Sequence, residues 1–235
     1  MFVKVCGLAT TADIDVAAEA GADAIGLVIS GTSVRGLDRD VAARLAAHAR
    51  SHTPAHVLCV LVVNDTPAEE AARLARELDV DALQLHGPYT GTDFERAARV
   101  FPRLWRATSL KERPDTRVGA LGEEVLLLDS PRAGSGARWD LSLLDGARPD
   151  GAWLLAGGLA PENVAEAIDR ARPWGVDVSS GVESAPGVKD HDRVRAFVAA
   201  AKATGAATAA VTDPAVVTAP SEVTAPAAKA AGAED

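Results

Sequence analysis

Two side chains of the sequence stand where apolar segments end, and their chemistry suits a base and an acid. Cys6 closes the first apolar segment of the chain, and Asp129 closes a later run of apolar residues. A carboxylate in that position is costly to bury without partners, so we expect Asp129 to meet solvent or a ligand. If the two groups face one cavity, a thiolate could remove a proton from carbon while a carboxylic acid opens a C–O bond. The second cysteine, Cys59, lies inside an apolar segment and is expected to be a core residue.

Glycine clusters offer a possible binding site for an anion. The sequence contains Ala156-Gly157-Gly158-Leu159, Ser179-Ser180-Gly181 and Gly134-Ser135-Gly136. Glycine lets the main chain approach an anion closely, so that backbone N–H groups can donate hydrogen bonds to it. The alternative is that these glycines only close tight turns, which is their commonest use in loops. The position of each cluster relative to the strands decides between the two interpretations.

Short apolar segments alternate with longer segments rich in Ala, Arg and Glu, a pattern typical of βαβ units around a parallel sheet. The pattern predicts eight strands, at residues 2–6, 24–29, 56–63, 82–85, 104–108, 125–129, 153–156 and 176–179. Helical periodicity is clearest at residues 11–20, 40–50, 67–78, 161–171 and 190–201. Pro67 and Pro161 are expected at the first position of their helices. The connection between Arg106 and Glu124 shows little periodicity, so its helix is the weakest prediction.

Eight strands with intervening helices fit a (β/α)8 barrel, a TIM barrel of the α/β class, whose strands are apolar because both faces of the sheet are covered. A doubly wound open sheet is the alternative, but it often has a glycine-rich turn after its first strand, and Cys6-Gly7-Leu8 is no such turn. Catalytic residues of a barrel lie at the carboxyl ends of its strands, and the loops after the seventh and eighth strands often bind phosphate. Gly157, Gly158, Ser180 and Gly181 occupy those two loops, which favours a phosphate site.

The composition of the 235 residues is that of a globular protein, with 48% hydrophobic and 24% charged residues. The 24 Lys and Arg residues against 33 Asp and Glu residues give a net charge of −9, which argues against nucleic acid or an anionic membrane as the main partner. Two cysteines are too few for a disulfide framework or a four-ligand zinc site. Because the N-terminal segment lacks the features of a signal peptide, we expect a cytoplasmic protein.

The composition changes abruptly near Gly205. Residues 205–235 contain 12 alanines with scattered Thr, Pro and Val, and no aromatic residue. Such a segment cannot bury enough apolar surface to offset its ordering entropy. We therefore predict a single barrel domain over residues 1–204 and a disordered tail over residues 205–235.

Seven motifs, in order along the chain and each at a predicted strand end, resemble those of phosphoribosylanthranilate isomerase, a metal-independent family of the tryptophan pathway. The resemblance runs from Val3 to about Ala201. The strings that carry it are Lys4-Val5-Cys6-Gly7, Ser33-Val34-Arg35, Gln84-Leu85-His86-Gly87, Leu128-Asp129-Ser130, Gly134-Ser135-Gly136 with Trp139-Asp140, Ala156-Gly157-Gly158-Leu159-Ala160-Pro161-Glu162-Asn163-Val164, and Asp177-Val178-Ser179-Ser180-Gly181-Val182-Glu183 followed by Pro186-Gly187-Val188-Lys189-Asp190.

The resemblance implies an Amadori rearrangement of N-(5′-phosphoribosyl)anthranilate to 1-(2-carboxyphenylamino)-1-deoxyribulose 5-phosphate, with no metal and no cofactor. It assigns Asp129 as the acid that opens the ribose ring and Cys6 as the base that removes the C2′ proton. Arg35 would hold the anthranilate carboxylate. The same resemblance gives the phosphate to backbone groups of Gly136, Gly157, Gly158, Ser180 and Gly181. The partner is then a small phosphosugar, with no nucleic acid and no membrane, and the protein is expected to be a monomer or a homodimer.

Three polar residues near the predicted site have secondary roles. A free thiol has a pKa of about 8.5, so Cys6 needs a nearby cation or another source of positive potential to act as a base. Lys4 is two residues upstream and points to the same face of the strand. His86 is expected to be structural more often than catalytic, and Asp177 is expected to fix loops by accepting main-chain N–H bonds.

Two alternatives to this isomerase stay open. One is a related isomerase or epimerase acting on a phosphosugar, including the bifunctional histidine and tryptophan type, which uses two aspartates where this chain has Cys6 and Asp129. The other is a catalytically impaired barrel that serves as a binding or scaffold subunit. Its motivation is the Arg35 loop, because the family's Ser-Pro-Arg is Ser33-Val34-Arg35 here and lacks the stiffening proline.

Overall fold

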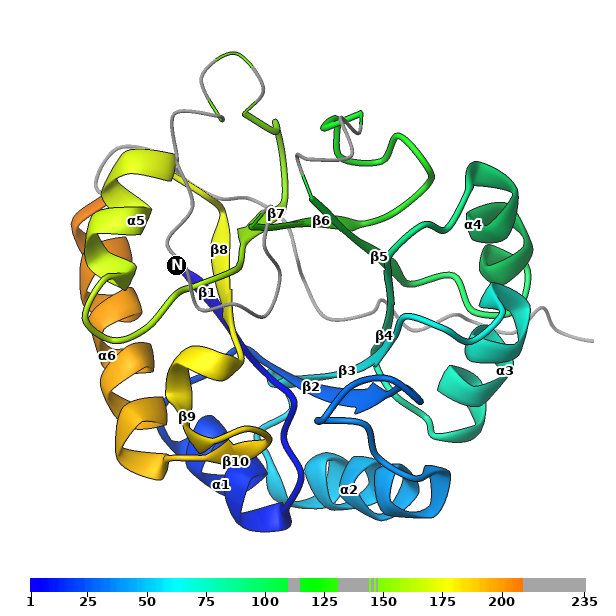
Figure 1. Cartoon of the computed structure of the whole chain (residues 1–235), viewed down its shortest axis with the longest axis horizontal. Helices are drawn as coiled ribbons and strands as arrows, with labels where there is room; N and C mark the ends of the chain where they lie inside the picture. The colour runs from blue at the N-terminus through cyan, green and yellow to red at the C-terminus, as the bar shows by residue number, and fades with distance from the viewer. Residues whose placement is uncertain (110–114, 131–143, 145, 147, 209–235) are drawn as a thin grey trace, which may run out of the picture.

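The computed structural model describes residues 1–109, 115–130, 144, 146 and 148–208. Eight parallel strands close into a barrel in sequence order, and helices surround it (Figure 1). This confirms the predicted (β/α)8 barrel. The strands are β1 (Phe2–Cys6), β2 (Ala24–Ile29), β3 (Leu58–Val63), β4 (Ala82–His86), β5 (Leu104–Ser109), β6 (Val125–Asp129), β7 (Trp153–Leu155) and β8 (Gly175–Val178).

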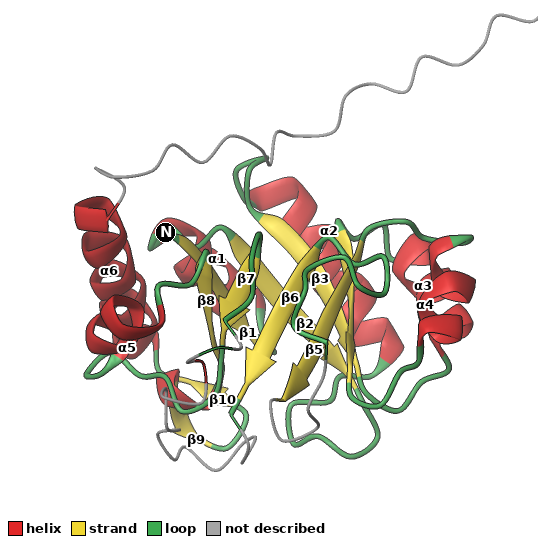
Figure 2. Cartoon of the chain, turned by 90° about the horizontal axis from the view of Figure 1, so that it is seen from above, coloured by secondary structure: helices red, strands yellow, loops and turns green. Residues whose placement is uncertain are grey.

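The barrel closes where β1 pairs with β8, with Phe2 opposite Gly175 and Val5 opposite Val178. Gly175 allows this close pairing, since a Cβ there would lie 2.6 Å from both the Phe2 carbonyl oxygen and the Leu154 side chain. Because all strands are parallel, their carboxyl ends meet at one end of the barrel. Figure 2 shows a small hairpin at that end, formed by β9 (Glu183–Ala185) and β10 (Val188–Lys189).

The helices pack around the barrel as α1 (Thr11–Glu19), α2 (Arg39–His52), α3 (Ala68–Glu77), α4 (Gly91–Ala98), α5 (Val164–Ala171) and α6 (His191–Thr208), with a 3-10 turn, η3 (Ser180–Val182), after β8. Helix α4 lies in a connection for which no helix range was predicted. A capping box starts it, in which Thr90 accepts from the Asp93 N–H and the Asp93 carboxylate accepts from the Thr90 N–H. None of the described helices is both long and apolar enough to cross a bilayer.

Some predicted boundaries differ from the observed ones. His56 lies in a turn before β3, and Ser179 lies just beyond β8. Pro67 is the N-cap of α3, and α5 begins at Val164 after the N-cap Asn163, so both prolines precede their helices. The described residues 115–124, between β5 and β6, form turns and no helix. Helix α6 ends at Thr208, so it extends past residue 204, where the barrel domain was predicted to end. Residues 209–235 lie outside the described part, so the rest of the tail stays a prediction.

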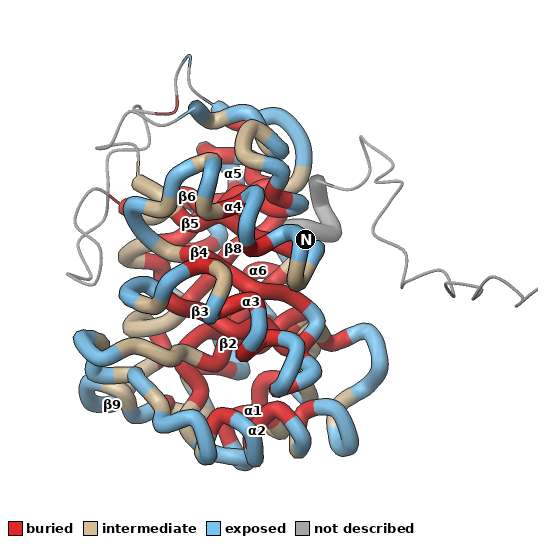
Figure 3. Tube along the Cα trace, turned by 90° about the vertical axis from the view of Figure 1, so that its right-hand side faces the viewer, coloured by how far each residue is buried: buried red, intermediate tan, exposed pale blue. Residues whose placement is uncertain are grey.

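Two apolar clusters make up the core. The larger lies between the strands and the helices, and the smaller fills the barrel interior, with Trp105 and Leu127 among its members. In Figure 3 the strands are almost continuously buried, as expected for a sheet covered on both faces. Apolar side chains therefore fill the barrel interior. Polar side chains inside the barrel lie toward the carboxyl ends of the strands. The packed core beneath these polar side chains supports them.

Candidate active site

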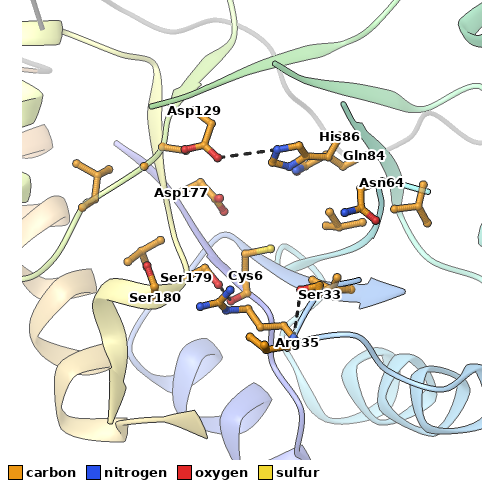
Figure 4. Close-up of a pocket in the computed structure, with 18 of the residues that line it drawn as sticks. Cys6, Ser33, Arg35, Asn64, Gln84, His86, Asp129, Asp177, Ser179 and Ser180 are labelled. Atoms are coloured by element: carbon orange, nitrogen blue, oxygen red, sulfur yellow. Dashed lines mark hydrogen bonds and ion pairs between the residues drawn. The ribbon is translucent and has the colours of Figure 1, made fainter. Parts of the chain in front are cut away.

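A pocket of about 450 Å³ opens at the carboxyl ends of the barrel strands. Six of the eight predicted site residues line it, from five parts of the barrel (Figure 4). They are Cys6, Arg35, Asp129, Gly157, Gly158 and Ser180. Gly181 does not line the pocket; a Cβ there would lie 1.8 Å from the Leu159 carbonyl oxygen, so this glycine lets two loops pack together. Gly136 and its neighbours Gly134 and Ser135 lie outside the described residues.

The thiol of Cys6 points into the pocket from the end of β1 (Figure 4). Gly26 on β2 makes room for it, because a Cβ on Gly26 would lie 2.7 Å from the Cys6 Sγ atom. Burial raises the pKa of the Cys6 thiol, while the neighbouring Lys4 ammonium acts to lower it. Cys59 is buried on β3 outside this pocket, as expected, and burial raises its pKa to about 12.

Below the thiol, a buried ion pair joins the strands that close the barrel. The Lys4 Nζ atom donates to Asp177 Oδ1 at 2.8 Å, and the lysine side chain is fully buried. Burial alone would lower the pKa of Lys4, but Asp177 and Cys6 more than offset this and the pKa lies above its usual value. The expectation that Asp177 accepts main-chain N–H bonds is wrong: among the described residues its hydrogen-bond donor is Lys4. The predicted barrel implies that β1 lies beside β8, but only the structure shows the register that sets Lys4 opposite Asp177.

The carboxyl group of Asp129 reaches the same pocket from the end of β6. Its Oδ1 accepts the Ser130 N–H at 2.7 Å, and its Oδ2 lies 3.9 Å from Nε2 of His86 on β4. Burial raises the pKa of Asp129, and burial lowers the pKa of His86. Both shifts favour neutral forms, so a carboxylic acid can persist at this position to a higher pH than in water. That is the state a proton donor needs.

The glycine loop after β7 presents main chain to the pocket. Gly157 and Gly158 have φ angles of 85° and 67°, a left-handed conformation that favours glycine. Asn163 fixes the loop, since its side chain donates to the Gly158 carbonyl and accepts from the Ala160 N–H. Within the described structure, the N–H groups of Gly157, Gly158 and Ser180 donate to no protein acceptor. Such groups at the pocket wall can bind an anion.

Arg35 enters the pocket from the loop after β2, and its guanidinium is already paired. Arg35 Nε and Nη2 donate to the two carboxylate oxygens of Glu183 on β9, at 2.6 and 2.7 Å. Sequence reasoning assigned no role to Glu183, although it belongs to the last of the motifs shared with the isomerases. Only the three-dimensional fold brings these two residues, far apart in sequence, into contact.

The described residues contain no cluster of three or more His, Cys, Asp or Glu side chains placed to hold a metal ion. The expectation of a reaction without metal or cofactor stays a prediction. The titratable groups that line the pocket are instead a thiol, two carboxyl groups, an imidazole and a guanidinium, with the buried Lys4 beneath them. Proton transfer at a bound small molecule is the chemistry that this set can perform.

Comparison with known proteins shows to which family this chain belongs. The family model for N-(5′-phosphoribosyl)anthranilate (PRA) isomerase matches residues 3–200. The N-(5′-phosphoribosyl)anthranilate isomerase of Bordetella parapertussis is 42% identical over 213 residues, covering 86% of this chain and 95% of that protein. The crystal structure of TrpF from Jonesia denitrificans is 52% identical with a TM-score of 0.80, covering 87% and 98% of the two chains. A phosphoribosyl anthranilate isomerase solved with reduced 1-(o-carboxyphenylamino)-1-deoxyribulose 5-phosphate is 33% identical with a TM-score of 0.73, covering 86% and 99%. This chain therefore belongs to the N-(5′-phosphoribosyl)anthranilate isomerase family.

Proposed function

We propose that this chain catalyses the Amadori rearrangement of N-(5′-phosphoribosyl)anthranilate to 1-(2-carboxyphenylamino)-1-deoxyribulose 5-phosphate, a step of tryptophan biosynthesis. The observation that carries the proposal is the convergence of Cys6 and Asp129, from non-adjacent strands, on one pocket that also meets the glycine loop after β7. A family member solved with the reduced product supports the same substrate class.

The reaction needs a proton donor first. The neutral carboxyl group of Asp129 gives its proton to the ribose ring oxygen as the C1′–O bond breaks, which leaves a Schiff base between C1′ and the anthranilate nitrogen. Burial keeps the pKa of Asp129 raised, and this favours the protonated form that the step consumes. His86 lies beside Asp129 and acts to lower the pKa of the carboxyl group, but burial outweighs this effect.

The second step removes a proton from carbon. The thiolate of Cys6 takes the C2′ proton, the C1′–C2′ double bond forms, and the electron pair of the Schiff base returns to nitrogen. The resulting enolamine then tautomerises to the ketose. The Lys4 ammonium lies beside the thiol and lowers the cost of ionising it. A bound phosphate at the N–H groups of Gly157, Gly158 and Ser180 would hold the sugar between the two groups, with Gly136 and Gly181 in the same role by resemblance.

The assay for this function follows anthranilate fluorescence. Purified protein added to phosphoribosylanthranilate should consume the substrate, and Cys6→Ser and Asp129→Asn should each remove the activity. Cys59→Ser is the matched control, since Cys59 is the other buried free cysteine and faces no part of the pocket. A folded wild-type protein that leaves the substrate unchanged would contradict the proposal and favour a binding or scaffold role.

The substrate is a small phosphosugar, and we propose that the enzyme works in the cytoplasm as a monomer or a homodimer, without nucleic acid or membrane as a partner. The net charge of −9 supports the proposal that neither nucleic acid nor an anionic membrane is a partner. Dimeric and monomeric forms occur among solved relatives, including monomers generated from the dimeric isomerase of Thermotoga maritima. Sedimentation of the purified chain at several concentrations tests the oligomeric state.

A further inference from the structure

The guanidinium of Arg35 is held by the carboxylate of Glu183, which does not line the pocket. Both oxygens of Glu183 accept from Arg35, from Nε at 2.6 Å and from Nη2 at 2.7 Å. The Glu183 side chain is 5% exposed and that of Arg35 is 19% exposed. This fork-to-fork geometry fixes the plane of the guanidinium, which a single hydrogen bond would not. The Nη1 group is not used by Glu183 and stays available to a ligand.

Glu183 is in turn anchored by the hairpin that carries it. The fully buried Lys189 side chain on β10 donates to Glu183 Oε1 at 2.7 Å, and the Gly187 N–H donates to Oε2 at 3.2 Å. Lys189 also donates to the Ser179 carbonyl at 3.0 Å, and the Ser179 hydroxyl donates to the Cys6 carbonyl at 3.0 Å. The chain of contacts therefore runs from Arg35 to the end of β1. These contacts link the Arg35 guanidinium to the backbone of Cys6, the residue that carries the thiol.

The loop of Arg35 needs such an anchor. The residue before Arg35 is Val34, so no proline ring stiffens the backbone there. Hydrogen bonds within the loop hold its backbone, and the hairpin packs against it. A Cβ on Gly187 would lie 3.0 Å from the Val34 carbonyl oxygen, and one on Gly7 would lie 2.7 Å from Arg35 Cδ. The arginine stem is thus clamped between the loop after β1 and the β9–β10 hairpin.

We propose that Glu183, anchored by Lys189, is a positioning residue that orients Arg35 toward the substrate's carboxylate and so determines selectivity for a carboxylated arylamine. The proposal rests on the proposed function. Glu183 does not touch the substrate and acts only through Arg35. The cluster of Arg35, Glu183 and Lys189 keeps one net positive charge, which is the charge that a single carboxylate needs. Glu183 uses Nε and Nη2 of the guanidinium, which leaves Nη1 for the substrate's carboxylate.

The test measures binding of two ligands that differ by one group. The first is reduced 1-(o-carboxyphenylamino)-1-deoxyribulose 5-phosphate, and the second is the same compound without its carboxyl group. Titration calorimetry of Glu183→Gln should show about tenfold weaker binding of the first ligand, the cost of ordering a freed arginine side chain. Binding of the second ligand should not change. In an Arg35→Met background, Glu183→Gln should have no further effect on either ligand.

A control separates orientation from general stability. Glu123 is a buried carboxylate that accepts from Arg106 Nε at 2.7 Å and lies away from the pocket. Glu123→Gln should lower the melting temperature and leave both affinities unchanged. If Glu183→Gln folds poorly because Lys189 is left unpaired, Glu183→Gln combined with Lys189→Met removes both buried charges and should show the same selective loss.

The outcomes are distinct. Equal weakening of both ligands would mean that the hairpin has only a structural role, and unchanged or tighter binding of the carboxylated ligand would mean that Glu183 competes with it; either result overturns the proposal. Failure of the proposed function would appear earlier, as a wild-type protein that neither turns over phosphoribosylanthranilate nor binds the first ligand.

Discussion

The main chain of Gly157 packs against the carboxyl group of Asp129. A Cβ on Gly157 would lie 2.4 Å from Asp129 Oδ1 and 2.5 Å from the Ser130 nitrogen. The glycine loop after β7 therefore packs directly against the carboxyl group at the end of β6. A side chain at Gly157 would displace the proposed acid as well as the main chain proposed to bind phosphate. The absence of a side chain at Gly157 is thus a condition for both parts of the site.

We expect Gly157→Ala to reduce kcat/KM by at least about 100-fold, the range set by loss of one general acid or base. Gly122→Ala is the matched control, because its φ of 86° is nearly that of Gly157, at 85°, but nothing lies within 4 Å of its Cβ position. Both variants carry the strain of a left-handed alanine, about 1 kcal/mol. Equal losses of activity in the two variants would show that backbone strain, not contact with Asp129, is responsible.

Removal of either proposed proton-transfer group should have a large effect on turnover. Cys6→Ser and Asp129→Asn should each lower kcat by about 10²–10⁴-fold, while the fluorescence assay on Cys59→Ser gives the wild-type rate. Asp129→Asn keeps the shape of the side chain and removes only the transferable proton. Binding of the reduced product should survive in both variants. Full activity of either one would remove that residue from the mechanism.

The titration of Cys6 should respond in opposite directions to its two charged neighbours. In a Cys59→Ser background, the pH midpoint of alkylation by iodoacetamide reports the pKa of Cys6 alone. Lys4→Met should raise this midpoint because it removes a cation, and Asp177→Asn should lower it because Asp177 raises the pKa of the thiol. Each change breaks a buried ion pair and is expected to cost about 3–5 kcal/mol of stability, so unfolding is followed in parallel. Midpoints that move together would contradict the assigned coupling.

Asp129→Asn should stabilise the protein near neutral pH. Burial raises the pKa of Asp129 in the folded state, so its ionised form costs folding free energy at neutral pH. That cost disappears as the pH falls through the raised folded value to the usual value of about 3.9, where both states are protonated. The melting temperature of Asp129→Asn should exceed that of the wild type at pH 7, by about 2–4 °C per kcal/mol. The difference should shrink toward pH 4, and a constant difference would refute this origin.

Inorganic phosphate should stabilise the protein by mass action if the glycine loops bind it. At a concentration 100 times its dissociation constant the gain is about 2.7 kcal/mol, visible as a higher melting temperature. Gly157→Asp places a carboxylate at the proposed site and should abolish the shift. Sulfate of equal ionic strength and sodium chloride serve as the anion and salt controls. A shift that persists in Gly157→Asp would move the phosphate site elsewhere.

The sequence by itself determined the barrel and the placement of its chemistry at the strand ends. Alternating apolar and helical segments sufficed for eight strands, because burial of both faces of a parallel sheet leaves a strong pattern. Cys6, Asp129, Gly157 and Gly158 followed from the rule that barrel sites lie at the carboxyl ends of strands. No range was predicted for α4, whose eight residues bury only Phe94 and Ala97 and which begins at a local capping box.

Only the tertiary structure decided which of these residues touch. The pairs Lys4 with Asp177 and Arg35 with Glu183 are 173 and 148 residues apart in sequence. Closure of the barrel brings β1 beside β8, and the β9–β10 hairpin folds back on the loop after β2. The predicted barrel implies that β1 lies beside β8, but the pattern does not give the strand register or the loop conformations that bring these side chains into contact. The sequence therefore named the reacting groups, while the fold determined how their charges are held and oriented.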